Sequence, residues 1–232
     1  MRISVRFPAA LAAVALLALS SATRAQAPST ANPTAGIGTY IASDPLAGVR
    51  YDNRYDLSLG MAYDHMKAGA NVLQGSNLGG LNLSGSYWFS KHWALEGSGR
   101  WYLGSSGAGT TNPSAVHGPF VSQSLFVAGP EWLGPHNKHG ALIAHALFGG
   151  AYFDAHLGGV SPQTENFYYN QVAPAAIIGG HMDLNRSARW VFRITPDAVL
   201  TRYSTNYAPL ITQNDVNFAI SVGFEYKFNK KR

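Results

Sequence analysis

Histidine is the side chain in this sequence that could bind a metal ion or exchange protons near neutral pH. The chain has eight histidines and no cysteine, so a zinc site would need imidazole and carboxylate ligands. His136 and His139 are three residues apart, and His145 and His181 are isolated. No His-x-x-x-His pair occurs, and no acid, His and Ser recur at a spacing typical of a catalytic triad. We therefore expect no metal site, no catalytic residues and no cofactor.

The charged residues show a second regularity, because several of them are separated by an even number of positions. Residues an even number apart in an extended strand lie on the same face. The charges that share the polar positions of their segments are Asp56, Asp64, Glu96, Arg100, Arg193, Asp197, Glu225 and Lys227. What these side chains can do depends on the strands that carry them.

Alternation of apolar and polar residues is the main structural signal, and it is clearest at the end of the chain. The apolar members are Val216, Phe218, Ile220, Val222, Phe224, Tyr226 and Phe228. Small or polar residues occupy the positions between them, which predicts a strand with one apolar face. Similar segments are predicted at residues 54–66, 78–90, 93–104, 119–132, 139–153, 172–184, 189–203 and 215–228. The fifth and sixth alternate poorly, so their registers stay open.

The lengths of these segments and of their links point to a membrane barrel. A tilted strand needs roughly 9–11 residues to cross a bilayer, whereas an ordinary strand has about 5–6. The short links are 91–92, 133–138 and 185–188, and the longer links are 67–77, 105–118, 154–171 and 204–214. Short and long links alternate, as periplasmic turns and external loops do in outer-membrane proteins. We predict an all-β fold, an eight-stranded antiparallel up-and-down transmembrane β-barrel over residues 54–228.

The tryptophans favour the same interpretation, because four of the five lie beside short links. Aromatic girdles at the membrane interfaces are typical of such barrels. The predicted girdle consists of Trp88, Trp93, Trp132, Trp190, Tyr226 and Phe228.

The polar face of the predicted strands decides between a membrane barrel and a soluble one. A secreted lipocalin-like, lipid-binding barrel would also have eight strands, but its outer face should be rich in Lys and Glu. Here that face is mostly Gly, Ala, Ser, Asn and Thr, which suits the narrow interior of an eight-stranded barrel. Charges buried there must be paired, so we expect a salt-bridged network that closes the lumen.

The N-terminal region is predicted to be a targeting segment followed by a linker. Residues 1–25 contain Arg2 and Arg6, an apolar run and small residues, which predicts a signal peptide cleaved after Ala25 or Ala27. Residues 26–53 are predicted to be a flexible periplasmic segment, and residues 229–232 form a basic tail. The net charge of +5 includes three arginines of the signal peptide, and no basic stripe suggests nucleic-acid binding.

On these residues the chain resembles the small outer-membrane β-barrel proteins, such as the OmpA transmembrane domain, OmpX and the opacity proteins. The resemblance covers about residues 54–228, and its most specific part is Val216 to Phe228, which ends in Tyr-Lys-Phe. That ending is similar to the terminal aromatic signal read by the barrel-assembly machinery, although four residues follow it here. The resemblance implies a monomer in the outer membrane, surrounded by lipid and lipopolysaccharide.

A structural or adhesin-like surface role is the function that these features favour. The third long link contains Phe167, Tyr168 and Tyr169, which we interpret as exposed aromatics able to contact an external ligand or to extend the girdle. One alternative is a lipid-modifying enzyme of the outer membrane, but the His-x-Ser-Asn arrangement of the deacylase group is absent. The other alternative is the soluble lipocalin-like barrel.

Overall fold

The computed structural model describes residues 44–67, 69, 75–105, 120–156, 168–205 and 212–228. The predicted signal peptide, residues 26–43 of the linker and the tail 229–232 lie outside them. The strands are β1 (Tyr55–Met66), β2 (Ser76–Trp88), β3 (Trp93–Ser105), β4 (Phe120–His136), β5 (Gly140–His156), β6 (Gln171–Asn185), β7 (Trp190–Ser204) and β8 (Thr212–Lys227). No helix within these ranges is long and apolar enough to cross a membrane.

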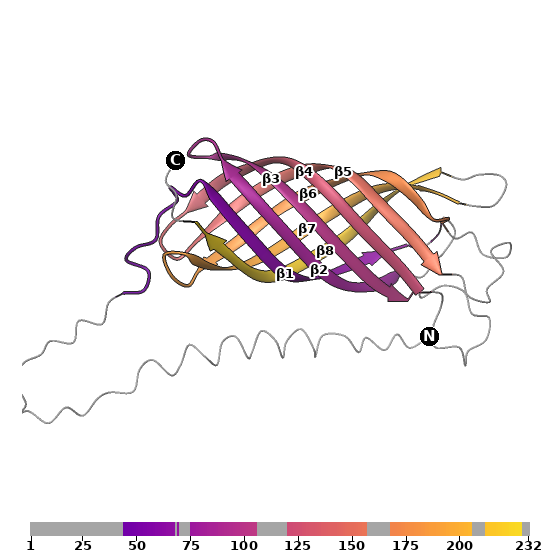
Figure 1. Cartoon of the computed structure of the whole chain (residues 1–232), viewed down its shortest axis with the longest axis horizontal. Helices are drawn as coiled ribbons and strands as arrows, with labels where there is room; N and C mark the ends of the chain where they lie inside the picture. Colours follow the sequence, from indigo (N-terminus) through magenta and orange to yellow (C-terminus); the bar gives the residue numbers. More distant parts are fainter. Residues whose placement is uncertain are drawn as a thin grey trace, which may run out of the picture. The chain divides into compact units, whose positions relative to one another are not determined.

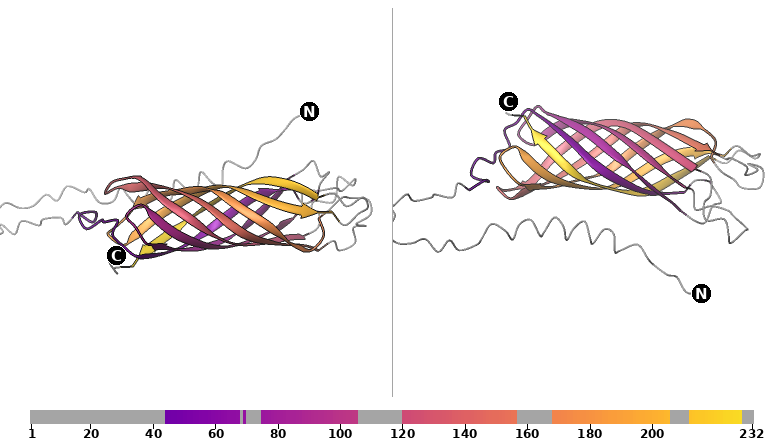
Figure 2. Two further views of the ribbon diagram at one scale, coloured as in Figure 1. Left: turned by 90° about the horizontal axis from the view of Figure 1, so that it is seen from above. Right: turned by 60° about the horizontal axis from the view of Figure 1, so that its bottom comes forward.

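The eight strands form one closed barrel in which every strand pairs with its sequence neighbours and β1 pairs with β8 (Figure 1). All pairings are antiparallel, and the strands are tilted against the long axis of the barrel (Figure 2). The predicted fold is therefore confirmed. We call the end with the links 89–92, 137–139 and 186–189 the short-turn end, and the opposite end the long-loop end.

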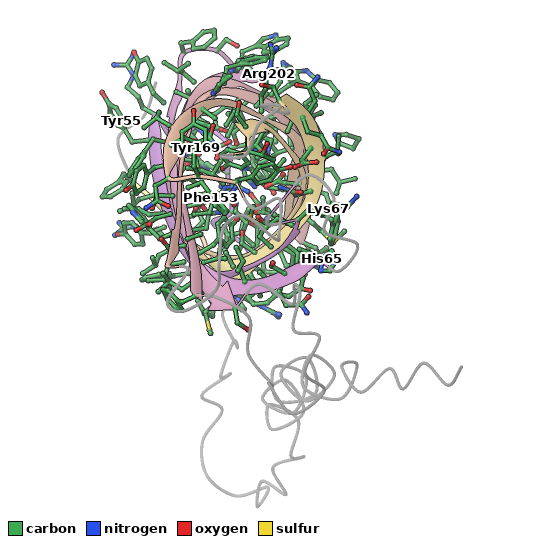
Figure 3. The ribbon with its side chains drawn as sticks, turned by 90° about the vertical axis from the view of Figure 1, so that its right-hand side faces the viewer. Tyr55, His65, Lys67, Phe153, Tyr169 and Arg202 are labelled. Atoms are coloured by element: carbon green, nitrogen blue, oxygen red, sulfur yellow. The ribbon has the colours of Figure 1, made fainter. Side chains whose placement is uncertain are left out.

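The alternating sequence places large apolar side chains outside the barrel and polar ones inside it. Along β1, Leu57, Leu59 and Met61 are exposed, whereas Asp56, Ser58 and Asp64 are buried. Figure 3 shows side chains filling the ring of strands, with Phe153 inside the ring and Tyr55 outside it. Such an exterior would be unfavourable in water but suits lipid. The interior contains buried charged and polar side chains together with an apolar cluster that includes Leu125, Leu147 and Ile177. The lipocalin-like alternative expects a polar outer face, and the apolar exterior does not fit it.

The fourth strand is longer than predicted and replaces most of the expected link 133–138. It continues to His136, and its pairing with β5 shifts register between Leu133 and His136. Gly134 and Pro135 lie at this shift. The Gly-Pro pair resembles a turn in the sequence, but here it forms an irregularity at the end of a strand, where a proline is tolerated.

The seam between the first and last strands depends on a pair of facing glycines. Gly60 of β1 lies opposite Gly223 of β8. A methyl group on Gly223 would lie 2.4 Å from the Cα atom of Gly60 and closer still to the carbonyl oxygen of Leu59. No side chain fits between the backbones at this position, so glycine is required for the strands to approach.

Of the residues predicted for the aromatic girdle at the short-turn end, all but one lie on the outside of the barrel. Trp93, Trp132 and Trp190 point outward, and the Trp190 ring packs on Tyr226, which in turn contacts Phe228. Trp88 was assigned to this girdle wrongly, because only 4% of its surface is exposed. Its neighbours Tyr87 and Phe89 are both exposed, so the alternation of the strand directs Trp88 inward.

Candidate functional site

The polar lumen is the candidate site, and at the short-turn end it is covered by a residue from the segment before β1. The Tyr51 hydroxyl accepts a hydrogen bond from Asn185 Nδ2 (2.7 Å) and donates one to the carbonyl oxygen of Asn137 (3.1 Å). Lys227 Nζ lies 4.3 Å from the centre of the Tyr51 ring. Burial raises the pKa of Tyr51, so the hydroxyl stays a donor. Residues 26–53 were predicted to form a flexible segment, but Tyr51, near its end, packs on the barrel.

Beneath Tyr51, the indole of Trp88 is bound to the first acidic residue of the lumen. Trp88 Nε1 donates to Asp56 Oδ2 at 2.6 Å, and Asn53 Nδ2 lies 3.4 Å from the same oxygen. Trp88 packs with Ala94, Leu133, Ala141 and Ile143 in an apolar cluster that Tyr51 also contacts. The cavity that remains between this cluster and Arg193 has a volume of about 10 Å³, which is about the size of one water.

Replacing Trp88 with phenylalanine should therefore destabilise the barrel. The ring would still fill the cluster, but the Asp56 carboxylate would lose a buried charge-assisted hydrogen bond, at a cost of about 1–3 kcal/mol. Urea unfolding of the protein in detergent micelles measures this free energy. Trp190→Phe, at an exposed position, is the matched control and should be close to neutral. Equal stability of both variants would show that the Trp88–Asp56 bond contributes nothing.

An ion-pair triad from three strands follows deeper in the lumen. Arg193 binds Asp183 in a bidentate manner, with Nε–Oδ1 at 2.7 Å and Nη2–Oδ2 at 2.9 Å. Its Nη2 atom also contacts Glu225 Oε2. All three side chains are at most 4% exposed. One guanidinium thus compensates two carboxylates, and Lys227 beside them donates to Asn185 Oδ1 at 3.3 Å.

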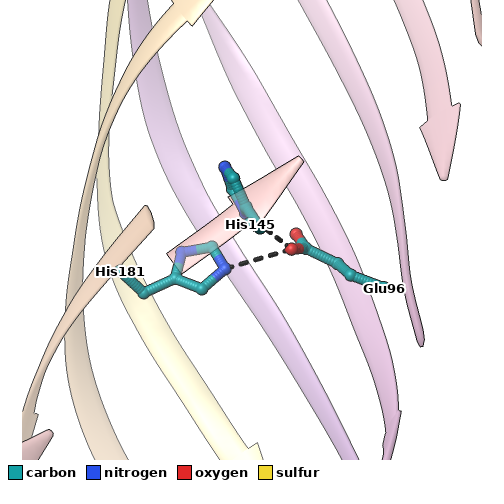
Figure 4. Close-up of side chains that lie close together, drawn as sticks. All are labelled: Glu96, His145 and His181. Carbon is teal, nitrogen blue, oxygen red and sulfur yellow. Dashed lines mark hydrogen bonds and ion pairs between the residues drawn. The ribbon is translucent and has the colours of Figure 1, made fainter. Parts of the chain in front are cut away.

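The centre of the lumen holds two histidines between acidic side chains. Glu96 Oε2 lies 2.7 Å from His145 Nδ1 and 3.2 Å from His181 Nε2 (Figure 4). The other ring nitrogens are also bonded, His145 Nε2 to Asp197 Oδ1 at 2.9 Å and His181 Nδ1 to Thr195 Oγ1 at 2.8 Å. Arg100 Nη1 pairs with Asp197 Oδ2 at 2.6 Å. We call Glu96, Glu131, His145 and His181 the central cluster.

Aromatic side chains close the lumen toward the long-loop end. The rings of Phe153, Tyr168 and Tyr203 lie with centroids 5.2–5.9 Å apart, and Gln123 Nε2 donates to the Tyr203 hydroxyl at 2.8 Å. The Tyr168 hydroxyl donates to Asp215. Burial raises the pKa of Tyr168 far above its usual value, so this donor keeps its proton.

The aromatic residues predicted for surface contact have different positions. Tyr169 is 39% exposed, but Tyr168 is 1% exposed and belongs to the aromatic layer inside the barrel. The prediction that Tyr168 is exposed is wrong, because a bridge between Tyr168 and Thr205 extends the barrel wall beyond β6 and β7 and turns the ring inward. Phe167 lies outside the described residues.

All the charges predicted to line the lumen are on inward positions, but sequence reasoning missed part of the site. Asp56, Asp64, Glu96, Arg100, Arg193, Asp197, Glu225 and Lys227 are at most 6% exposed. Neither carboxylate oxygen of Asp64 has a hydrogen-bond partner among the described residues. Glu131, Asp183, His145 and His181 were not assigned to the network. Their inward parity was the available signal. It was hidden by small residues on both faces of β5 and β6, and in β4 by large apolar residues on the inward face, such as Val121 and Leu125.

Comparison with known proteins agrees with this architecture. No protein-family model and no curated protein matches the chain. The barrel is similar to the outer membrane protein OprG from Pseudomonas aeruginosa, with 12% sequence identity and a TM-score of 0.52 over 79% of this chain and 99% of that chain. It is also similar to Neisserial surface protein A, with 10% identity and a TM-score of 0.52 over 75% of this chain and 97% of that one.

At these identities the similarity shows the fold, which is that of the small outer-membrane barrels that the sequence resembles. This fold and the lipid-facing exterior together define an outer-membrane β-barrel protein.

Proposed function

We propose that this protein is a closed, non-conducting barrel that serves as a scaffold in the outer membrane and presents its outer rim and loops for surface contacts. The observation that carries the proposal is the closure of the lumen at both ends, by Tyr51 and Trp88 at one end and by Phe153, Tyr168 and Tyr203 at the other. A barrel filled with packed and ion-paired side chains offers no path for solutes. The function therefore lies on the surface and not in the lumen.

The absence of solute flow should be measurable directly. Purified protein reconstituted in planar lipid bilayers should show no discrete conductance steps in 1 M KCl, while a general porin in the same bilayers provides the positive control. Reproducible steps from the purified monomer would contradict the closed-lumen proposal. We propose that the barrel is a monomer whose exposed apolar side chains face lipid.

The role of the surface can be tested by removing one loop. Cells that express the protein should adhere more strongly to host-cell monolayers or glass than cells without it. Deletion of residues 160–166 should abolish the gain, whereas a deletion of similar size at 109–115, in another long link, is the matched control. Adhesion that does not depend on expression would reduce the proposal to a purely structural role.

We propose a non-enzymatic role because His65, the rim histidine whose side chain the structure describes, has no catalytic partner among the described residues. The exposed His65 Nδ1 atom lies 2.9 Å from Asn77 Oδ1, and the Tyr63 hydroxyl donates to the same Asn77 oxygen. Among the described residues, neither a serine nor an acid is bonded to this imidazole, so no activated nucleophile is formed there. Recognition of β8 by the barrel-assembly machinery is part of the same proposal and rests on its apolar outward face.

A further inference from the structure

The lumen contains more acid than base. Among the described residues, the acidic side chains buried in the barrel are Asp56, Asp64, Glu96, Glu131, Asp183, Asp197, Asp215 and Glu225, and the basic ones are Arg100, Arg193, Lys227, His145 and His181. An uncompensated carboxylate is expensive in an interior closed to water. A bound cation would compensate part of the excess, and the question is where the donor atoms for it converge.

The donors converge at the central cluster. Glu96, His145 and His181 each offer one ligand atom, and these three atoms lie within 4.8 Å of one another. Metal–ligand bonds of about 2.0–2.2 Å place the ligands of a tetrahedral zinc ion roughly 3.3–3.6 Å apart. The observed separations of 2.7 and 3.2 Å from Glu96 Oε2 to the two ring nitrogens are somewhat shorter than this, so the side chains would move apart to admit an ion.

A second observation is a buried carboxylate beside this cluster whose nearest ion-pair contact is long. Glu131 is fully buried, and neither of its oxygens has a hydrogen-bond partner among the described residues. Its Oε1 atom lies 4.0 Å from His181 Nε2. In the pairing of β4 with β5, Glu131 stands opposite His145. It is therefore placed to supply a fourth ligand, which would remove the cost of its burial.

The outer contacts of both histidines are those that metal-bound imidazoles normally have. His145 Nε2 is held by Asp197, which is in turn held by Arg100, and His181 Nδ1 is held by the Thr195 hydroxyl. Such contacts orient the two rings, so that one nitrogen of each faces Glu96 Oε2. Gly179 leaves room for this arrangement, because a methyl group there would lie 2.0 Å from Asp197 Oδ1.

We propose that the central cluster binds one divalent transition-metal ion of the zinc class, through Glu96, Glu131, His145 and His181. Nitrogen and carboxylate donors together favour such ions over Mg²⁺ or Ca²⁺, which prefer oxygen ligands alone. The ligands come from β3, β4, β5 and β6, so the ion joins four consecutive strands. The site is closed to solvent by the two ends of the lumen, and the ion has a structural role that is acquired during folding.

Metal content after refolding tests this proposal. The full chain is unfolded in urea, freed of metal with EDTA, and refolded in detergent micelles with ZnCl₂ because the finished barrel admits no ion. After gel filtration, plasma mass spectrometry should find about one zinc ion per folded barrel. Folded protein is recognised by its different migration on a gel before and after boiling. His145→Gln and His181→Gln should each reduce this content by roughly tenfold or more. His92→Gln, at an exposed turn position, should retain it.

Two measurements on the wild-type protein test the same proposal if a histidine variant folds poorly: the absorption spectrum with Co²⁺ and the urea midpoint with Zn²⁺. Wild-type protein refolded with CoCl₂ should show the visible absorption bands of tetrahedral Co²⁺. Its urea midpoint should rise with Zn²⁺ concentration during refolding and not with MgCl₂. Substoichiometric zinc in folded wild-type protein, or equal zinc in the His145→Gln and His92→Gln variants, would overturn the proposal and leave the cluster as a hydrogen-bonded network only.

Discussion

Arg193→Met should destabilise the barrel by about 3–5 kcal/mol, because it leaves two buried carboxylates without their shared cation. Methionine keeps much of the side-chain volume, so the loss reports charge and hydrogen bonding more than packing. Arg193 makes two hydrogen bonds to Asp183 and also contacts Glu225, and all three groups are buried. Unfolding in urea followed by tryptophan fluorescence, with heat-modifiability on gels as a check of folding, measures the change.

Two further variants separate this charge effect from a general effect of mutation. Arg189→Met removes an exposed arginine from a short turn and should change stability by less than about 0.5 kcal/mol. The triple variant Arg193→Met, Asp183→Asn, Glu225→Gln removes all three charges together and should recover part of the loss. If Arg193→Met unfolds at the same urea concentration as the wild type, the ion-pair triad does not stabilise the lumen.

Met61→Arg should cost about 2–4 kcal/mol in a lipid bilayer, because it places a charge near the membrane midplane. Met61 lies at the middle of β1 and is 76% exposed on the outside of the barrel. The measurement is the free energy of unfolding from phosphatidylcholine vesicles. Insertion of the Met61→Arg variant into these vesicles should also be slower than that of the wild type.

Position along the barrel axis provides the control for this prediction. Phe120→Arg makes a comparable change at the first residue of β4, on the long-loop rim, and should cost only about 0–1 kcal/mol because the side chain reaches the interface. Met61→Leu should be close to neutral. Equal costs for Met61→Arg and Phe120→Arg would mean that the apolar exterior is not embedded in lipid.

The sequence predicted the fold well wherever large and small residues alternate. In β8 the outward aromatics determine which face points to lipid, because a slip of one residue would turn all of them inward. In β5 and β6, alanine and glycine occupy both faces, as at Ala144, Gly149 and Gly179, and side-chain size no longer distinguishes inside from outside. The registers of these two strands became known only from their pairing with neighbours.

The sequence predicted that a network of paired charges fills the lumen, but it did not predict all the residues that form the network. Even spacing correctly placed Glu96 and Arg100 on one inward face, yet spacing within one strand cannot show which strands lie opposite each other across the lumen. His145 and His181 meet Glu96 from strands separated by 49 and 85 residues in the chain. Trp88 shows the converse error, because its nearness to a turn suggested the girdle while the parity of its strand indicated the lumen.

The β1–β8 seam has a consequence for the order of folding. Gly60 and Gly223 pair across it, although they lie near opposite ends of the barrel sequence. Because closing so long a loop costs more entropy than pairing neighbouring strands, we expect this contact to form last. The ion-pair triad straddles the last step, because Arg193 and Asp183 belong to β7 and β6 while Glu225 arrives only with β8. In a partly assembled barrel, Arg193 therefore binds Asp183 alone, and pairing of β8 adds its contact with Glu225. Gly60 and Gly223 have no side chains that would obstruct the approach of β8 to β1. We therefore expect closure of the barrel and completion of the ion-pair triad to occur together.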